Sequence, residues 1–304
     1  MFMTNTEIAI IGAGTAGLTS AIYCARAGKN VIVFEKGVTG GRITEAEKVE
    51  NYPGISTITG SELGQIMANQ TKSLSAKIVS EEVTGIYPEE NIVKTPYESY
   101  RCKAVIIAAG LKNRMPNAKN AKKFLGRGLS FCALCDGGFF KGKDVCVLGG
   151  GNTALSEALY LSELCSRVCI IHRRNTFRAE DYLVKKASKT VNISFIMETE
   201  IIEFVGENSL TGINVKSGGD EKFIKTDGVF SALGYIPNAD LYKHLVPTDK
   251  DGFALCDENC RTNYNSIFIA GDCRRKDVRQ IITACADGAV AAHHACEAIE
   301  NSNS

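Results

Sequence analysis

Residues 130–138, SFCALCDGG, place Cys132 and Cys135 two residues apart, with Asp136 directly after them. Two thiols at this spacing suit either half of a zinc site or a dithiol that opens and closes as a disulfide. Zinc needs four ligands, usually in two close pairs separated by roughly 12 to 20 residues. The close pair Cys256 and Cys260 lies about 120 positions downstream, far outside that range, so the spacing favours a redox pair.

The other cysteines fit the reduced thiols of a cytosolic protein better than the disulfide framework of a short secreted chain. Cys256 and Cys260 are interpreted as unpaired loop thiols, and a secondary redox role for them is left open. Five more cysteines lie in apolar helix or strand patterns and are expected to be inert core thiols. These are Cys24, Cys146, Cys165, Cys169 and Cys285.

The elements around the redox pair include a repeated unit. IAIIGAGTAGLTSAIYCARAGKNVIVFEK, from Ile8, and VCVLGGGNTALSEALYLSELCSRVCIIHRR, from Val145, align without a gap when the first is shifted by 137 positions. Each copy reads as strand, glycine turn, helix and strand, the context that a G-x-G-x-x-G/A dinucleotide motif requires. The first glycine makes the turn, the second lets the backbone approach a pyrophosphate, and the third position must be small.

The second strands of the two copies end differently. The first ends on Glu35, whose carboxylate can accept hydrogen bonds from a ribose diol. The second ends on His172-Arg173-Arg174, with Arg178 four residues later, and guanidinium groups offer bidentate bonds to a 2′-phosphate. The second copy therefore predicts an NADP(H) site, although a solvated basic turn would look the same. Two dinucleotide sites in one chain suggest hydride transfer between cofactors, which makes the first copy a flavin site by inference.

Further motifs follow in order along nearly the whole chain: GAGTAGLTSAIYCARAG, GGRITEAEKVENYPGI, FCALCDGGFFKGKDV, GGGNTA, HRRNTFRA, ALGYIPN and IFIAGDCRRKDVRQIITACADGAVAA. This series closely resembles the low-molecular-weight, bacterial-type thioredoxin reductases of the FAD/NADPH pyridine nucleotide-disulfide oxidoreductase family. The resemblance implies an enzyme that passes electrons from NADPH through FAD and the Cys132–Cys135 pair to oxidised thioredoxin or a thioredoxin-like protein. It also implies a homodimer.

The resemblance assigns roles to residues. Cys135 would face the flavin, Cys132 would attack the partner's disulfide, and Asp136 would carry the proton that thiol release requires. The implied FAD contacts are Gly12, Gly14, Thr15, Ala16, Gly17, Glu35, Lys36, Gly41, Arg42, Asn51, Gly110, Gly271, Asp272, Arg279, Gln280 and Ile281. The implied NADPH contacts are Gly149, Gly151, Asn152, Thr153, Ala154, His172, Arg173, Arg174 and Arg178. No metal is expected.

The resemblance also implies the architecture, an α/β protein with two Rossmann-like, three-layer ββα domains. A discontinuous FAD-binding domain would comprise residues 1–114 and 239–304, with the NADPH-binding domain, residues 115–238, inserted into it. The crossings AAGLKNRMP and ALGYIPNAD are turn-rich and contain proline. Because Cys135 lies only 14 residues before Gly149, dithiol and NADPH would share one domain. We expect this domain to rotate about its crossings between the half-reactions.

Bulk properties restrict the class of partner. The chain has 304 residues, enough for two domains of ordinary size. Its net charge of +1 gives no whole-chain attraction for nucleic acid or an anionic membrane. The longest apolar runs are too short to cross a bilayer, and strand-like residues begin by Ile8, which leaves no room for a signal peptide. A cytoplasmic protein is expected.

Other readings stay open. A related flavin dithiol enzyme could take electrons from ferredoxin or pass them to oxygen, but relatives without NADPH would be expected to lose the GGGNTA or HRR pattern. A non-catalytic flavin redox sensor would turn over slowly with any disulfide. A peroxiredoxin-serving reductase usually carries an additional N-terminal dithiol module. Three residues depart from the family pattern: Thr15 replaces a common proline, Arg42 a common glutamine and Asn152 a frequent aspartate.

Overall fold

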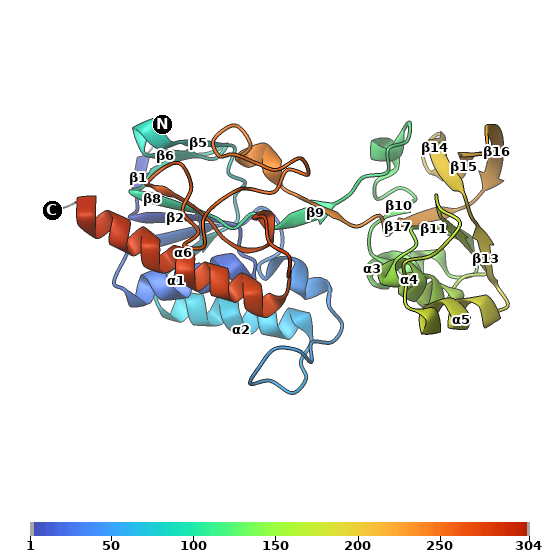
Figure 1. The fold of residues 1–304 in the computed structure, drawn as a ribbon, viewed down its shortest axis with the longest axis horizontal. Coiled ribbons are helices and arrows are strands. Elements are labelled where there is room, and N and C mark those ends of the chain that lie inside the picture. Colours follow the sequence, from blue (N-terminus) through green and yellow to red (C-terminus); the bar gives the residue numbers. More distant parts are fainter. Residues whose placement is uncertain (1–2, 303–304) are drawn as a thin grey trace. The chain divides into compact units, whose positions relative to one another are not determined.

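The computed structural model describes residues 3–302, and the chain divides into two compact units. One unit comprises Met1–Lys112 and Ile236–Ser304, and the other comprises Asn113–Tyr235. The second unit is therefore an insertion between two parts of the first. The chain crosses between them in β9 (Leu111–Asn113) and β18 (Tyr235–Pro237), which pair as a two-stranded ribbon (Figure 1).

A parallel sheet in the order β19-β8-β2-β3-β4 forms the centre of the first unit. Every residue of β2, β3 and β8 is buried, as expected for parallel strands covered on both faces. Three helices cover one face, and the sheet β1-β7-β6-β5 covers the other (Figure 1). The strands are β1 (Met3–Asn5), β2 (Ile8–Ile11), β3 (Val31–Phe34), β4 (Lys77–Val79), β5 (Gly85–Tyr87), β6 (Ile92–Lys94), β7 (Ser99–Arg101), β8 (Ala104–Ile107) and β19 (Ile267–Ile269), and the helices are α1 (Thr15–Arg26), α2 (Gly60–Ser73) and α6 (Ile281–Ser302).

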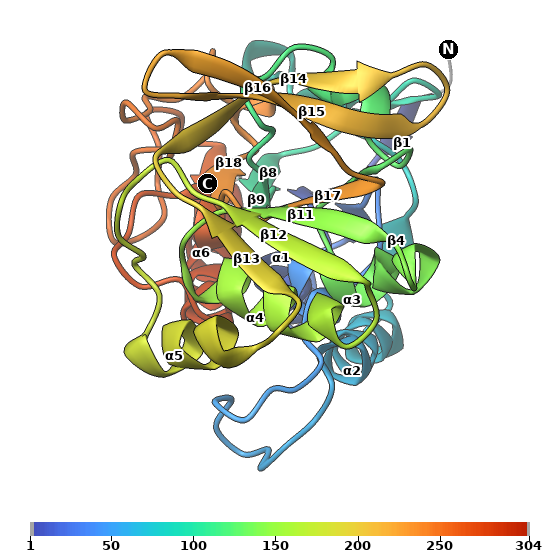
Figure 2. The ribbon, with the colours of Figure 1, turned by 90° about the vertical axis from the view of Figure 1, so that its right-hand side faces the viewer.

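The second unit repeats this plan with a parallel sheet in the order β10-β17-β11-β12-β13. Figure 2 shows helices α3, α4 and α5 on one face of this sheet and the antiparallel strands β14, β15 and β16 on the other. The strands are β10 (Leu129–Ser130), β11 (Asp144–Leu148), β12 (Arg167–Ile171), β13 (Ile193–Ile196), β14 (Thr199–Gly206), β15 (Leu210–Ser217), β16 (Asp220–Lys225) and β17 (Gly228–Ser231), and the helices are α3 (Ala133–Asp136), α4 (Asn152–Ser162) and α5 (Asp181–Lys189).

The duplicated motif is now visible as matching structure. The first copy forms β2, α1 and β3, the second forms β11, α4 and β12, and in each copy the two strands are parallel neighbours. Both units are three-layer ββα folds, which confirms the predicted fold class. Short 3₁₀ helices connect the main elements: η1 (Gly41–Glu45), η2 (Pro88–Glu90), η3 (Ala121–Phe124), η4 (Gly137–Phe140), η5 (Ala239–Leu241) and η6 (Gly271–Cys273).

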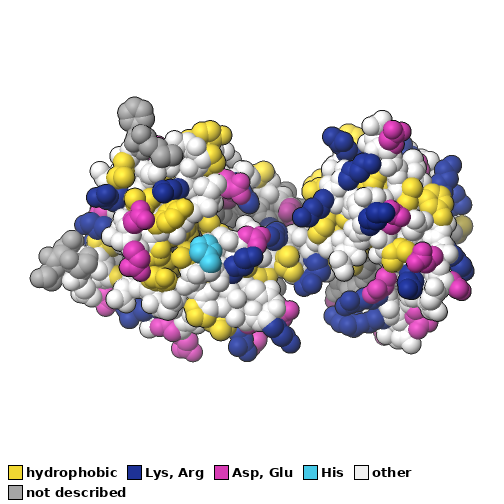
Figure 3. Space-filling view, turned by 90° about the horizontal axis from the view of Figure 1, so that it is seen from above, with side chains coloured by type: hydrophobic (Ala, Val, Ile, Leu, Met, Phe, Trp, Pro, Cys, Tyr) yellow, Lys and Arg dark blue, Asp and Glu magenta, His cyan; other side chains and the backbone are white. Residues whose placement is uncertain are grey.

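The distribution of surface charge and the character of the helices bear on the class of partner. On the face drawn in Figure 3, Lys and Arg side chains are interspersed with Asp and Glu over each unit. Among the described residues, no helix combines the length and apolar character needed to cross a membrane.

Candidate active site and nucleotide sites

The redox turn follows β10 in the second unit. Cys132 and Cys135 form a disulfide with their Cα atoms 5.4 Å apart, as the spacing predicted. Cys132 caps the N-terminus of α3, and its Sγ accepts a hydrogen bond from the backbone N–H of Cys135 at 3.1 Å. The Cys132 side chain is half-buried and that of Cys135 is exposed. A backbone N–H directed at Cys132 Sγ would stabilise negative charge there once the disulfide opens.

A serine joins the acid of this turn to the first cysteine. Ser130 Oγ donates to Asp136 Oδ2 at 2.6 Å and accepts a bond from the backbone N–H of Cys132 at 3.0 Å. Ser130 is buried, whereas Asp136 is half-buried. Residue types and spacing gave no sign of this bridge, because a serine two residues before a cysteine is common in loops.

The second glycine turn lies between β11 and α4. Gly149 has a φ of +143°, and a Cβ there would lie 2.6 Å from Ala232 O, so the turn needs glycine. Gly151 differs, because it caps α4 in extended conformation and none of the described residues in contact range places an atom within 4 Å of its ideal Cβ position. Ala154 is fully buried against the turn. The structure therefore leaves open space at the second glycine, where the motif needs a pyrophosphate to approach.

The basic segment after β12 is fastened to this turn. The backbone N–H groups of Arg178 and Ala179 both donate to Gly150 O, at 2.7 and 3.2 Å. Asn152 makes two hydrogen bonds to Glu180, both at 2.8 Å. Its Nδ2–H donates to Glu180 Oε1, and its Oδ1 accepts from the Glu180 backbone N–H. The side chain of the predicted cofactor residue Asn152 is therefore hydrogen-bonded to the loop that carries the arginines.

His172 is buried, in contrast to the exposed Arg173 and Arg174 that follow it. Its ring stacks on Phe177 at 5.5 Å between centroids, and Nε2 lies 3.1 Å from Thr176 O. Burial lowers the pKa of His172 below its usual value, with a smaller contribution from the neighbouring arginines. The imidazole is neutral and held by Phe177 and Thr176 at the end of the strand. Positive charge for an anionic ligand would therefore come from the arginines.

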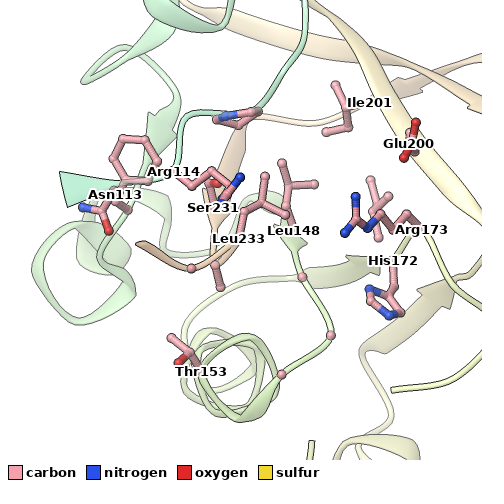
Figure 4. A pocket seen from close by; sticks show the side chains of 18 of the residues that line it. Asn113, Arg114, Leu148, Thr153, His172, Arg173, Glu200, Ile201, Ser231 and Leu233 are labelled. Atoms are coloured by element: carbon pink, nitrogen blue, oxygen red, sulfur yellow. The ribbon is translucent and has the colours of Figure 1, made fainter. Parts of the chain in front are cut away.

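A cavity of about 710 Å³ in the second unit collects most of the predicted NADPH residues. Its walls include Gly149, Gly151, Thr153, His172, Arg173, Arg174 and Arg178. Figure 4 shows Arg173 and Glu200 reaching this region from different elements, the loop after β12 and strand β14. Several lining residues had no sequence signal, namely Arg114, Glu157, Glu200 and Ser231. Ser231 Oγ is buried and has no hydrogen-bond partner within the described part of the chain.

The first glycine turn is tightly built. Gly12 has a φ of +105°, and a Cβ on Gly17 would lie 1.8 Å from Gly12 O. Glu35, at the end of β3, accepts the Ala13 N–H at Oε2 and the Gly37 N–H at Oε1, both at 2.7 Å. These bonds hold the carboxylate beside the turn, at the place where the motif needs an acceptor for a ribose diol. Gly41 packs against Gly14, where its ideal Cβ would lie 3.0 Å from Gly14 Cα.

The end of β19 meets the same turn from the C-terminal part of the unit. A Cβ on Gly271 would lie 2.7 Å from Ala16 Cβ, so the predicted residues Gly271 and Ala16 are in contact. The backbone N–H of Gly271 donates to Asp287 Oδ2 at 3.1 Å. Asp272 Oδ1 is buried and, among residues 3–302, lies 3.5 Å from Lys276 Nζ as an ion pair without a hydrogen bond.

Asp287 on α6 organises the charges behind this strand end. Its carboxylate receives Arg274 Nη1 at 3.0 Å and Lys276 Nζ at 2.9 Å, and all three side chains are at most 14% exposed. Two cations thus compensate the largely buried carboxylate of Asp287, and Lys276 also lies 3.5 Å from the half-buried Asp272. The sequence offered no signal for this network, which residue spacing alone does not reveal.

The other predicted FAD residues separate into two groups. Thr15 begins α1 beside the turn, and Gly110, with a φ of +58°, follows β8. Asn51 Nδ2 donates to Gln280 Oε1 at 3.1 Å, which joins two segments distant in sequence just before Ile281 begins α6. The second group has other side-chain partners: Lys36 pairs with Glu82 at 2.9 Å, Arg42 Nε lies 3.8 Å from Glu45, and the Arg279 guanidinium lies 4.1 Å from the ring centroid of Phe253.

The other cysteines are free. Cys24, Cys146, Cys165 and Cys285 are buried and Cys169 is half-buried, although Cys165 follows α4 instead of lying within it. Cys260 Sγ lies 3.2 Å from Arg274 Nη1, and burial raises its pKa to about 12. Within residues 3–302, no group of three or more His, Cys, Asp or Glu side chains could hold a metal ion.

Two dinucleotide-type glycine turns and a disulfide beside one of them define a nucleotide-dependent disulfide oxidoreductase. A model of the pyridine nucleotide-disulphide oxidoreductase family matches residues 6–288. The thioredoxin reductase of Listeria monocytogenes is 37% identical over 299 residues, covering 97% of this chain and 94% of the relative. The chain therefore belongs to the pyridine nucleotide-disulphide oxidoreductase family, among the thioredoxin reductases.

Solved structures of thioredoxin reductases are also similar to this chain. The Lactococcus lactis thioredoxin reductase in its FR conformation has a TM-score of 0.86 and 36% identity, covering 97% of this chain and 99% of that one. The T. acidophilum thioredoxin reductase has a TM-score of 0.82 and 36% identity, with 99% of both chains covered. A ferredoxin-flavin thioredoxin reductase from Clostridium acetobutylicum is also similar, at 32% identity and a TM-score of 0.53 over 99% of both chains.

Proposed function

We propose that this chain reduces the disulfide of thioredoxin, or of a thioredoxin-like protein, with electrons from NADPH by way of FAD. The observation that carries the proposal is the Cys132–Cys135 disulfide in the same unit as a cavity lined by a dinucleotide-type turn and three arginines. The names of the relatives, thioredoxin reductases, support the choice of substrate.

The second unit, predicted as residues 115–238, would bind NADPH. The cavity offers open space at Gly151 for a pyrophosphate, and Arg173, Arg174 and Arg178 offer charge for a 2′-phosphate. The buried Ser231 hydroxyl, which lacks a partner among the described residues, is a further polar group that a bound nucleotide could satisfy. Asn152 would act indirectly, through the loop, and not as a ligand contact.

The first unit, predicted as residues 1–114 and 239–304, would bind FAD. The residues fit such a group: Gly12 and Gly17 form a turn without side chains, Glu35 presents an oriented carboxylate, and Asp272 Oδ1 is buried without a hydrogen bond from any described residue. FAD supplies the two-electron exchange between a nicotinamide and a disulfide. We propose that Gly41, Asn51, Gly110, Arg279, Gln280 and Ile281 also contact this group, as the resemblance implies. The side chains of Lys36 and Arg42, which the resemblance also implies, have acidic partners in the structure.

The dithiol would work in two steps. Cys132 is the proposed nucleophile, because the Cys135 N–H already points at its sulfur and would stabilise the thiolate. Cys135 then closes the enzyme's disulfide, and Asp136 carries the proton between the thiols. We also propose that the second unit rotates about β9 and β18, because it holds both the dithiol and the NADPH cavity. A crosslink that locks the two units should stop turnover while leaving one half-reaction intact.

We propose a cytosolic homodimer. Ten of the 12 cysteines are free, the state in which reducing compartments keep thiols. The helices that cover the central sheet of the first unit carry exposed apolar side chains, among them Tyr23 on α1, Ile66 on α2 and Ile282 on α6. Light scattering with size-exclusion chromatography tests this, and replacing Tyr23 with Glu should shift the mass toward the monomer. A monomeric wild type would contradict the proposal.

Anaerobic titration tests the activity. The FAD-loaded protein should bleach on addition of NADPH, more readily than with NADH, and regain its flavin absorbance when oxidised thioredoxin is added. Cys132→Ser should still bleach with NADPH but should no longer reduce thioredoxin. Unchanged thioredoxin reduction by this variant would show that the dithiol assignment is wrong.

A second candidate is a flavin dithiol enzyme that takes its electrons from ferredoxin, since one similar solved structure carries that name. The arginine-lined cavity argues against it, because a ferredoxin-only enzyme has no need for a 2′-phosphate site. Rapid anaerobic bleaching by NADPH excludes the ferredoxin-only version.

A further inference from the structure

Ser130 occupies a fixed point beside the redox turn. It is the last residue of β10, which pairs in parallel with β17, Ser130 lying opposite Phe230, and it is only 6% exposed. From this position its hydroxyl contacts three groups. It donates to Asp136 Oδ2 at 2.6 Å, accepts from the Cys132 N–H at 3.0 Å, and lies 3.3 Å from Cys132 O.

We propose that Ser130 is the positioning residue of the proton-transfer step, holding the Asp136 carboxyl group in one place relative to Cys132 throughout thiol–disulfide exchange. The inference rests on the function proposed above and adds a residue to it. The sequence singled out the cysteines and the acid, and nothing in the relatives' names assigns this serine a role.

The need for a holder follows from the local structure. Asp136 ends α3, a helix of only four residues, and is followed directly by the glycine pair of η4. Without a bond to another side chain, the torsions of an aspartate at this helix end would be free to change rotamer. Among the described residues, Ser130 is the one side chain that bonds the Asp136 carboxyl group. Since Ser130 belongs to the sheet, the position of the acid is set by the sheet and not by the loop.

A hydroxyl suits this task because it can serve both protonation states. When Asp136 is ionised, the Ser130 O–H donates to Oδ2. When Asp136 carries a proton, its own O–H can donate to Ser130 Oγ, whose hydrogen then turns to Cys132 O. The Cys132 N–H uses the remaining lone pair in both states. Alanine could serve neither state, whereas threonine keeps the hydroxyl and could serve both.

The exchange that this arrangement would support is balanced. Cys132 Sγ forms a bond to one sulfur of the partner's disulfide, that disulfide breaks, and the released partner sulfur takes up the proton that left Cys132. Cys135 then loses its proton to Asp136 and bonds to Cys132 Sγ, and the second partner sulfur leaves with the proton from Asp136. Two electrons and two protons pass from the enzyme's dithiol to the partner, and Asp136 ends ionised as it began.

The test compares Ser130→Ala and Ser130→Thr in the FAD-loaded enzyme. Ser162→Ala is the matched control, because the Ser162 hydroxyl is also part-buried in this unit and bonds Leu159 O at 2.6 Å. Ser130→Ala should lower kcat for oxidised thioredoxin roughly tenfold or more, a modest share of what proton transfer contributes. The KM for thioredoxin and the anaerobic reduction of the flavin by NADPH should stay within twofold, and Ser130→Thr and Ser162→Ala should stay near wild type.

A kcat unchanged in Ser130→Ala would overturn the proposal, as would an equal loss in the alanine and threonine variants. A double-mutant cycle with Asp136→Asn covers the case in which Ser130→Ala merely loosens the turn. If Ser130 acts through Asp136, adding Ser130→Ala to Asp136→Asn should cause little further loss, whereas independent, multiplying losses contradict it. Failure of the proposed function itself would look different, because the wild-type enzyme would then not reduce thioredoxin with NADPH, or Cys132→Ser would reduce it as fast as wild type.

Discussion

Single glycines decide what the two dinucleotide turns can hold. Gly17 leaves no room for a side chain, because its ideal Cβ would lie 1.8 Å from Gly12 O. Gly151 occupies the equivalent of Gly14 in the second copy, and nothing lies within 4 Å of its ideal Cβ position. Gly17 is required by packing, whereas Gly151 faces space that a ligand can fill.

This contrast predicts opposite outcomes for two glycine-to-alanine substitutions. Gly17→Ala should destabilise the fold by about 3 kcal/mol or more, because its Cβ would overlap backbone. Gly151→Ala should change the free energy of unfolding by only about 1 kcal/mol, the order of a helix-cap change, yet weaken NADPH binding at least tenfold. Thermal unfolding of the FAD-loaded protein and NADPH titration measure both. A destabilised Gly151→Ala with normal NADPH affinity would reverse the assignment.

The arginines predict a difference between nucleotides. Arg173 lines the cavity, and NADH lacks the 2′-phosphate that its guanidinium would bind. Arg173→Ala should raise the KM for NADPH roughly tenfold, about 1.4 kcal/mol, and change that for NADH by less than twofold. Steady-state kinetics with both nucleotides decide this, with Arg167→Ala as the control, since Arg167 pairs with Asp144 and lies outside the cavity lining. Equal effects on both nucleotides would remove Arg173 from a 2′-phosphate site.

At the scale of elements, the loop after β12 is held by a matched pair of side chains. Asn152 at the start of α4 both donates to and accepts from Glu180, while two backbone N–H groups of the loop bind Gly150 O. The loop carries Arg173, Arg174 and Arg178, so its attachment to the glycine turn sets where the guanidinium groups lie. An aspartate, frequent at this position in the family pattern, would change that attachment here.

The pair predicts a reversible loss. Asn152→Asp keeps the acceptor for the Glu180 N–H but sets two carboxylates against each other, so the KM for NADPH should rise several-fold. Adding Glu180→Gln restores a donor and should return the KM toward the wild-type value. Kinetics of the two single variants and the double variant measure the coupling. If the double variant were as poor as the sum of the singles, the two side chains would not act as a pair.

The sequence predicted those elements whose signals are local. The glycine turns, the buried parallel strands and the disulfide could be predicted because each depends on residues close together in the sequence. The duplication supported the prediction, because the two copies of the motif agree with each other. The sequence did not predict the cluster of Asp287, Arg274 and Lys276 or the hydrogen bond from Ser130 to Asp136. Both depend on contacts between elements or on side-chain direction. The same limit explains Asn152, which lies in the predicted motif but bonds Glu180.

At the scale of the whole molecule, the course of the chain restricts how the two half-reactions can be served. The dithiol and the arginine-lined cavity belong to the unit Asn113–Tyr235, which is connected to the rest only through β9 and β18. If both must be presented in turn, the backbone at these crossings has to absorb the change in orientation. Gly234, directly before β18, has a φ of +84°, and no atom lies within 4 Å of its ideal Cβ position.

Gly234→Ala therefore tests the hinge without filling occupied space. Alanine resists the left-handed conformation, so the substitution should restrict the crossing while leaving the dithiol and the cavity arginines in place. Steady-state kcat should fall several-fold, because each turnover requires both orientations, whereas flavin reduction by NADPH and dithiol exchange with thioredoxin, each measured alone in a single turnover, should stay within about twofold of wild type. Since Gly234 also lines the cavity, NADP⁺ affinity is measured alongside. A kcat loss matched by lost NADP⁺ affinity would assign the effect to the cavity, and an unchanged kcat would mean that this crossing does not limit alternation.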